Sequence, residues 1–230
     1  MMIRNLLLSS VLLSAGGAAY AADATAEAPS MLQEVSLGYD LNTLRPSGGS
    51  DFSLNGFTAG YNIDFRLSDA LPVYVGTGLD WHFLFRTKTY NDSESYNALS
   101  AKVKTTFINF NIPLNVSYRV PVADRFFMTP QLGLDFRLQV YGHQKTTANV
   151  AAREIDTPVD AAGVSAGSVN LFSKNQLGDN ALRRFQLGWH AGLKFQYDSF
   201  VLGVSYGTDF VKLRNELGSS NLLVNLGYMF

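Results

Sequence analysis

Hydrophobic and polar residues alternate one by one along much of this chain. The stretch 107–120 shows the pattern best: every second side chain from Ile108 to Val120 is apolar, and those between them are mainly Asn, Ser and Arg. Successive side chains of a strand point to opposite faces, so such a segment has one apolar face and one polar face. It runs for about a dozen residues, whereas strands of globular proteins typically have roughly 5–6. The pattern predicts long amphipathic strands.

Eight segments share this alternation, and the links between them differ in length. The segments are 32–41, 54–67, 73–86, 107–120, 126–141, 184–196, 202–210 and 222–230. The predicted links after the second, fourth and sixth segments are short, whereas those after the others are long and include 87–104 and 142–183. An antiparallel meander places all short links at one end, as in outer-membrane barrels with short periplasmic turns and long extracellular loops. The sequence predicts an all-β fold: an eight-stranded antiparallel up-and-down transmembrane β-barrel over residues 32–230.

Glycine positions indicate which face of the strands points inward. Eleven strand glycines fall in the polar phase and none in the apolar phase: Gly38, Gly56, Gly60, Gly76, Gly78, Gly133, Gly188, Gly192, Gly203, Gly207 and Gly227. The alternative is a soluble eight-stranded barrel of the lipocalin type, with its apolar face inside. Small residues mixed with charged ones suit a narrow lumen better than a solvent-facing surface. We therefore expect the polar face to line the lumen and the apolar face to contact lipid.

The N-terminal segment predicts export. Arg4 precedes an apolar core at 6–13, and Ala19-Tyr-Ala21 fits a signal-peptidase cleavage site. A membrane helix is the alternative, but the apolar core is too short to span a bilayer. We expect residues 1–21 to be a signal peptide, 22–31 a flexible spacer, and the mature protein to reach the outer membrane of a Gram-negative bacterium.

Composition narrows the function classes. Only 16% of residues are charged, compared with about a quarter in soluble domains. The net charge of −1 leaves no basic surplus for nucleic acid, and the absence of cysteine excludes disulfides, thiolate catalysis and cysteine-bound zinc.

Three short stretches carry a family resemblance. Asn109-Phe-Asn-Ile-Pro-Leu114 and the following Phe126-Phe-Met-Thr-Pro-Gln-Leu-Gly133 resemble the central hairpin of the PorT-like outer-membrane β-barrel family, common in Bacteroidetes. Leu71-Pro-Val-Tyr-Val-Gly-Thr-Gly-Leu79 resembles the hairpin before it. The resemblance implies an eight-stranded barrel of the OmpX or OmpA type in the outer membrane. It implies little chemistry, because the name-giving member is associated with protein secretion and most members have no assigned role.

Two details accompany this resemblance. Pro113 lies within a predicted strand, where proline removes a hydrogen-bond donor, so we expect a local bulge there, as the family pattern also carries a proline. The ending Leu226-Gly-Tyr-Met-Phe230 resembles the terminal-strand signal read by the barrel-assembly machinery. We expect Phe230 to serve as that assembly signal.

The polar phase contains many ionisable residues, which predict a filled lumen. An eight-stranded barrel is just wide enough inside for side chains, and unpaired charges there are costly. We therefore expect mutual pairing and no conducting pore, with a small-solute porin as the alternative. The expected structural polar network comprises Asp64, Arg66, Asp80, His82, Arg86, Arg119, Asp135, Arg137, His190, Lys194 and Asp209.

Catalytic signals are weak. The histidines are His82, His143 and His190, which are scattered at no ligand spacing, and no G-x-S-x-G elbow occurs. We expect no catalytic, cofactor-binding or metal site and no cofactor. An outer-membrane lipid-modifying enzyme is the alternative.

The 142–183 link is too long for a simple connection. It is expected either to bind a secretion or surface partner or to cap the lumen or lack structure. The other expected partners are outer-membrane lipid and, during biogenesis, the barrel-assembly machinery. The protein is expected to be monomeric and not to bind nucleic acid.

Overall fold

A computed structural model describes residues 29–92, 99–150, 153–154, 167–214 and 217–230. The predicted signal peptide and most of the predicted spacer therefore lie outside the described residues. The strands are β1 (Met31–Pro46), β2 (Phe52–Ser68), β3 (Leu71–Asp92), β4 (Leu99–Tyr118), β5 (Val120–Ala123), β6 (Phe126–Val150), β7 (Arg153–Glu154), β8 (Gly167–Asn170), β9 (Phe185–Tyr197), β10 (Phe200–Asp209) and β11 (Leu217–Met229). The short helical turns α2 (Lys174–Leu177) and η2 (Gly178–Asn180) follow β8. Neither has the length or hydropathy to traverse a bilayer, and the same holds for any other helix among the described residues.

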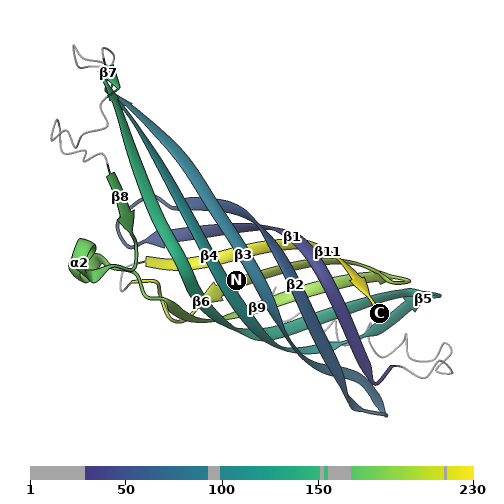
Figure 1. The fold of residues 1–230 in the computed structure, drawn as a ribbon. Coiled ribbons are helices and arrows are strands. Elements are labelled where there is room, and N and C mark those ends of the chain that lie inside the picture. The colour runs from purple at the N-terminus through teal and green to yellow at the C-terminus, as the bar shows by residue number, and fades with distance from the viewer. Residues whose placement is uncertain (1–28, 93–98, 151–152, 155–166, 215–216) are drawn as a thin grey trace, which may run out of the picture.

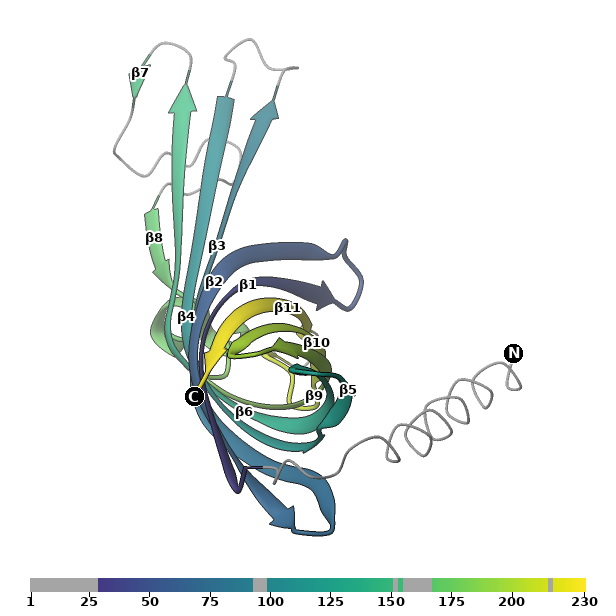
Figure 2. The same ribbon diagram turned by 90° about the vertical axis from the view of Figure 1, so that its right-hand side faces the viewer.

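Eight of these strands close into a ring, which confirms the predicted barrel. Neighbours in the ring are β1, β2, β3, β4, β6, β9, β10 and β11, all antiparallel. The seam is the ladder between β1 and β11, which runs from Glu34 opposite Met229 to Pro46 opposite Leu217. β5 continues the line of β4 into a turn, and β7 and β8 pair with the far part of β6. Figure 2 shows the ring nearly end-on.

The two faces of the strands divide as the alternation predicts. On β4, Leu114 is 46% exposed, whereas the next residue, Asn115, is 6% exposed. Because the ring encloses the polar phase, exposed apolar side chains such as Trp81 and Phe57 cover the outside. This outer surface matches a hydrocarbon environment.

The inward glycines make room for long polar side chains on neighbouring strands. Gly76 lies opposite Asp64 and Gly60 opposite Asp80 in the β2–β3 ladder, and added Cβ atoms would collide with those carboxylates. At Gly133 a Cβ would lie 2.7 Å from Cε1 of His190. The glycine phase is therefore a packing requirement of a crowded lumen.

Three strands extend well beyond the barrel, which corrects the predicted loops at 87–104 and 142–183. β3 continues to Asp92 and β4 begins at Leu99, and β6 continues to Val150. Their ladders are continuous to the tip, with Asp92 opposite Leu99 and Leu99 opposite Val150. The extensions escaped detection because their alternation is weak: residues 87–89 and 144–147 are all polar, and only β4 alternates, with Ala101 buried beside the exposed Lys102. Figure 1 shows these strands rising above the remaining ring; we call this part, residues 87–92, 99–106 and 143–150, the extended sheet.

The predicted bulge at Pro113 is wrong. Pro113 stays in register opposite Asp135, and the irregularity between β4 and β6 falls between Ile108 and Asn109. On the other side of β4 the ladder with β3 has no pairs between the Thr77–Leu114 and Asp80–Asn111 pairs, although the register is unchanged. The missing N–H of proline is thus accommodated by a local gap in one ladder, without an extra residue.

Candidate functional site

A buried ion pair crosses the lumen. Nζ of Lys194 on β9 donates to Oε2 of Glu34 on β1 at 2.6 Å, and the side chains are 10% and 1% exposed. Two opposite charges removed from water require this mutual contact, because either one alone would carry a large desolvation penalty. The pair joins strands that are not neighbours in the ring.

Two histidine–carboxylate pairs lie in the same lumen. Nδ1 of His82 is 2.7 Å from Oδ2 of Asp40, and Nδ1 of His190 is 3.0 Å from Oδ2 of Asp135. Asn111 Nδ2 donates to the other oxygen of Asp135 at 2.9 Å. All five side chains are buried. Each imidazole is thereby held in one orientation by a carboxylate.

A third group is centred on Asp209. Nη1 of Arg137 donates to its two carboxylate oxygens at 3.2 and 3.3 Å, and Gln186 Nε2 donates at 2.7 Å. Gln139 donates in turn to Gln186 at 2.7 Å, and the Ser219 hydroxyl contacts Asp209. The uncharged residues Gln139, Gln186 and Ser219 were not among the expected site residues. The two glutamines lie in the polar phase of their strands, which indicates that they point into the lumen.

The other expected residues lie at the edges of this network. Asp80 accepts a 3.4 Å hydrogen bond from Asn62, and Asp64 borders a cavity of about 10 Å³. The arginines are placed differently. Arg119 donates to Gln196 at 3.1 Å, Arg66 donates to the Asp69 carbonyl at 2.8 Å beside a short turn, and Arg86 lies over the Phe52 ring at 4.7 Å.

A cavity of about 60 Å³ remains in the described lumen. His82, Asn111 and Asn115 border it, and each has one buried polar atom without a protein partner. A polar cavity of this size accommodates a few water molecules, which satisfy such atoms. Among the described residues no group of three or more acidic, histidine or cysteine side chains has the arrangement of a metal site.

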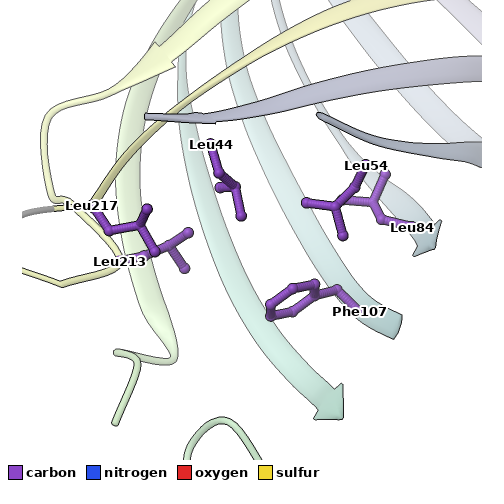
Figure 3. Packing of buried hydrophobic residues seen from close by; sticks show 6 residues of the cluster. All are labelled: Leu44, Leu54, Leu84, Phe107, Leu213 and Leu217. Carbon is purple, nitrogen blue, oxygen red and sulfur yellow. The ribbon is translucent and has the colours of Figure 1, made fainter. Parts of the chain in front are cut away.

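An apolar cluster closes the lumen toward the extended sheet. We call it the apolar plug, and Figure 3 shows its buried members: Leu44, Leu54, Leu84, Phe107, Leu213 and Leu217. Their side chains come from β1, β2, β3, β4, β11 and the β10–β11 link. The inward phase thus changes from polar to apolar near this end of the barrel.

Part of the long 142–183 link packs on this plug. The Phe172 ring lies 6.4 Å from that of Phe107, and Leu171 donates its N–H to the Gly142 carbonyl at 2.9 Å. The guanidinium group of Arg184 lies over the Phe172 ring, 4.5 Å from its centroid. We call residues 170–184 the lid. The lid caps the lumen, as one expectation for this link has it, whereas binding of a partner by this link stays a prediction. Residues 151–152 and 155–166 of the link lie outside the described residues.

The expected assembly residue Phe230 and the third histidine, His143, which was not an expected site residue, lie on the outside. Phe230 is 61% exposed, and its backbone exchanges hydrogen bonds with Gln33 at 3.0 and 3.4 Å beside the β1–β11 seam. His143 lies on the extended sheet, where its ring stacks on Tyr141 and contacts the Ser168 hydroxyl at 3.1 Å.

A closed ring with an apolar exterior and a polar, packed interior defines the class of integral outer-membrane barrels. Residues 30–213 match a family described as outer membrane protein beta-barrel domain. The chain belongs to this family and is an outer-membrane β-barrel protein. No curated protein matches the sequence.

The solved structures to which this chain is similar are distant in sequence. The attachment invasion locus protein Ail of Yersinia pestis is 15% identical, with 88% of this chain and 100% of Ail covered and a TM-score of 0.44. Neisserial surface protein A is 14% identical over 86% of this chain and 97% of its own, with a TM-score of 0.40. The outer-membrane enzyme PagL is 10% identical over 82% and 98%, with a TM-score of 0.38. At these identities the likeness concerns the fold alone.

Proposed function

We propose that this protein is a non-catalytic outer-membrane barrel with a closed lumen, and that its role lies at the cell surface, in binding through the extended sheet. The observation that carries the proposal is the double closure of the lumen. Buried ion pairs fill its middle, and the apolar plug with the lid fills the end next to the extended sheet. A solute would have to displace both. The strands that continue past this closure are then the part available to a partner.

The enzymatic alternative receives little support from the geometry. An acyl-transfer site needs a nucleophile within hydrogen-bond reach of an oriented base. The Asp40–His82 and Asp135–His190 pairs supply oriented imidazoles, but His82 Nε2 has no protein partner. The cavity beside them holds about 60 Å³, which is water-sized rather than substrate-sized. These pairs are better explained as part of the packing of the lumen.

A finer assignment extends the proposal. The hairpin residues 109–114 and 126–133 favour a PorT-like protein, which would make assistance to secretion the specific role. The leader at residues 1–21 supplies the route to the outer membrane in this proposal.

Planar-bilayer recording tests the closed lumen. The purified full chain is expected to insert without stable single-channel steps, because the ion pairs and the plug leave no continuous water path. A matched positive control replaces Phe107 and Leu84 of the plug with Ser and Lys194 and Glu34 with Ala. Reproducible steps from the unaltered protein would refute the proposal and favour a small-solute porin.

A further inference from the structure

The outward face of the extended sheet carries a cluster of lysines. On β4 the outward phase continues from Ile108 through Thr106 to Lys104 and Lys102, and on β6 it continues from Tyr141 through His143 to Lys145. The register places Lys104 directly opposite Lys145. All three lysines are exposed. We call Lys102, Lys104 and Lys145 the outward lysines.

No carboxylate neutralises these lysines among the described side chains. The ion pairs of the described part involve other cations, and the strand partners of Lys102 are Thr89 and Thr147. Like charges directly opposite each other on a sheet are destabilising. An external anion would relieve the repulsion between Lys104 and Lys145, because no described carboxylate of the protein does so.

The height of the outward lysines above the membrane indicates the source of that anion. The apolar exterior of β6 ends at Tyr141, which is 45% exposed and stacks on His143. Aromatic residues of this kind mark the boundary of the hydrocarbon layer. Lys145 follows four residues later, a rise of about 13 Å along a tilted strand at roughly 3.3 Å per residue. A strand tilt of about 40° makes this roughly 10 Å along the membrane normal, just above the polar headgroup layer, which adds about 5–8 Å to each side of the hydrocarbon core. Lysine side chains are long enough to bend back into that layer.

We propose that the outward lysines bind phosphate groups on the headgroups of the surrounding outer-leaflet glycolipid. This inference deepens the proposed function, since it rests on surface binding by the extended sheet and names the chemistry of the partner. The outward lysines lie on the same outer face of β4 and β6 as the lipid-contacting residues. Their side chains therefore point toward the surrounding lipid, which favours a neighbouring lipid over a soluble polyanion. The bound headgroups would brace the base of the extended sheet against the membrane surface.

The test titrates lipopolysaccharide onto the purified full chain in nonionic detergent. The outward triple variant carries Lys102→Gln, Lys104→Gln and Lys145→Gln. Each lysine near an anionic surface contributes on the order of a fivefold change in affinity, so the triple variant is expected to bind roughly 100-fold more weakly. Binding by the unaltered protein is expected to weaken as salt is raised, and dephosphorylated lipopolysaccharide is expected to bind poorly.

A matched control removes three positive charges elsewhere. Lys88 lies on the opposite face of the extended sheet, Lys174 lies in α2, and Lys212 lies in the β10–β11 link. The triple Lys88→Gln, Lys174→Gln, Lys212→Gln is expected to bind like the unaltered protein. Heat-modifiable electrophoretic mobility of each variant establishes that the barrel has formed.

Three results of the lipopolysaccharide titration would overturn the inference. These are unchanged binding by the outward triple, an equal loss in the control triple, and equal binding of dephosphorylated lipopolysaccharide. Tight binding of heparin without binding of lipopolysaccharide would also refute it and would assign the lysines to a soluble polysaccharide. These binding results are independent of conductance. The closed lumen is tested separately, by the bilayer recording.

Discussion

Lys194 and Glu34 form a buried ion pair, and the stability of the lumen is expected to be sensitive to the loss of either charge. Removal of one partner from a buried pair leaves an uncompensated charge and typically costs about 3–5 kcal/mol. Their 2.6 Å contact and near-complete burial place them in this class.

Lys194→Met is therefore expected to lower the free energy of unfolding by about 3–5 kcal/mol, measured by urea titration in lipid vesicles. The double variant Lys194→Met, Glu34→Gln is expected to recover much of this loss because it removes both charges. Equal destabilisation in the single and double variants would show that packing, and not charge, holds this position.

At the residue scale, the sequence specifies the face on which a side chain lies but not its partner. The alternation places Asp135 and Arg137 in the lumen, as the structure does. Yet Arg137 pairs with Asp209, and Lys194 pairs with a residue 160 positions away. These pairings depend on the stagger of the strands around the ring, which strand-by-strand patterns do not contain. Prediction of residue orientation therefore succeeds where prediction of contacts fails.

At the scale of elements, the lid packs on the plug through Phe172, with Leu171 and Leu182 beside it. Phe172 contacts Phe107, and a Cβ added at Gly142 would lie 2.5 Å from the Phe172 ring. These apolar contacts and backbone hydrogen bonds to neighbouring segments, such as Arg183 N–H to the Leu213 carbonyl at 2.8 Å, hold the lid in place.

Phe172→Ala is expected to expose the plug to water from outside the cell. Since the chain has no cysteine, a single Leu44→Cys reporter can be labelled with a membrane-impermeant maleimide on intact cells. We expect slow labelling in the otherwise unaltered protein and labelling at least tenfold faster, to order of magnitude, after Phe172→Ala, which removes most of a buried aromatic contact. A Leu114→Cys reporter, which faces lipid, serves as the control. Unchanged labelling of Leu44→Cys would mean that the plug is sealed without the lid.

Elements were predictable where lipid and lumen impose opposite demands on alternate residues. The barrel portions of β2, β4 and β9 meet this condition. The distal part of β6, with Thr146 and Thr147 on opposite faces, does not, and its strand character comes from pairing with β4 and β8. The lid likewise has no periodicity of its own, because its conformation follows from Phe172 entering a space created by other strands.

At the scale of the whole molecule, the β1–β11 seam completes the barrel. Phe230 continues this seam through two backbone hydrogen bonds to Gln33, and its ring stacks on Tyr228 at 6.5 Å between centroids. Its outward ring lies on the lipid-facing side, where an assembly factor can reach it.

Deletion of Phe230 is expected to reduce the amount of assembled barrel in the outer membrane several-fold, because it removes both the outward aromatic ring and the end of the seam. Heat-modifiable mobility of membrane fractions measures the assembled form. Phe230→Tyr is the conservative control and is expected to assemble normally. Normal assembly after deletion would refute the role of Phe230 as an assembly signal.

The seam also constrains the order of folding. β1 and β11 are the ring neighbours farthest apart in sequence, and every other barrel strand lies between them. Until they meet, the sheet has two edges with unpaired N–H and C=O groups, which hydrocarbon cannot satisfy. Hairpins formed locally, such as β9–β10, can therefore pair early, but they cannot enter lipid one at a time without heavy cost. Insertion and ring closure must be coupled, and the loop-closure entropy of the whole barrel is lost in that one step.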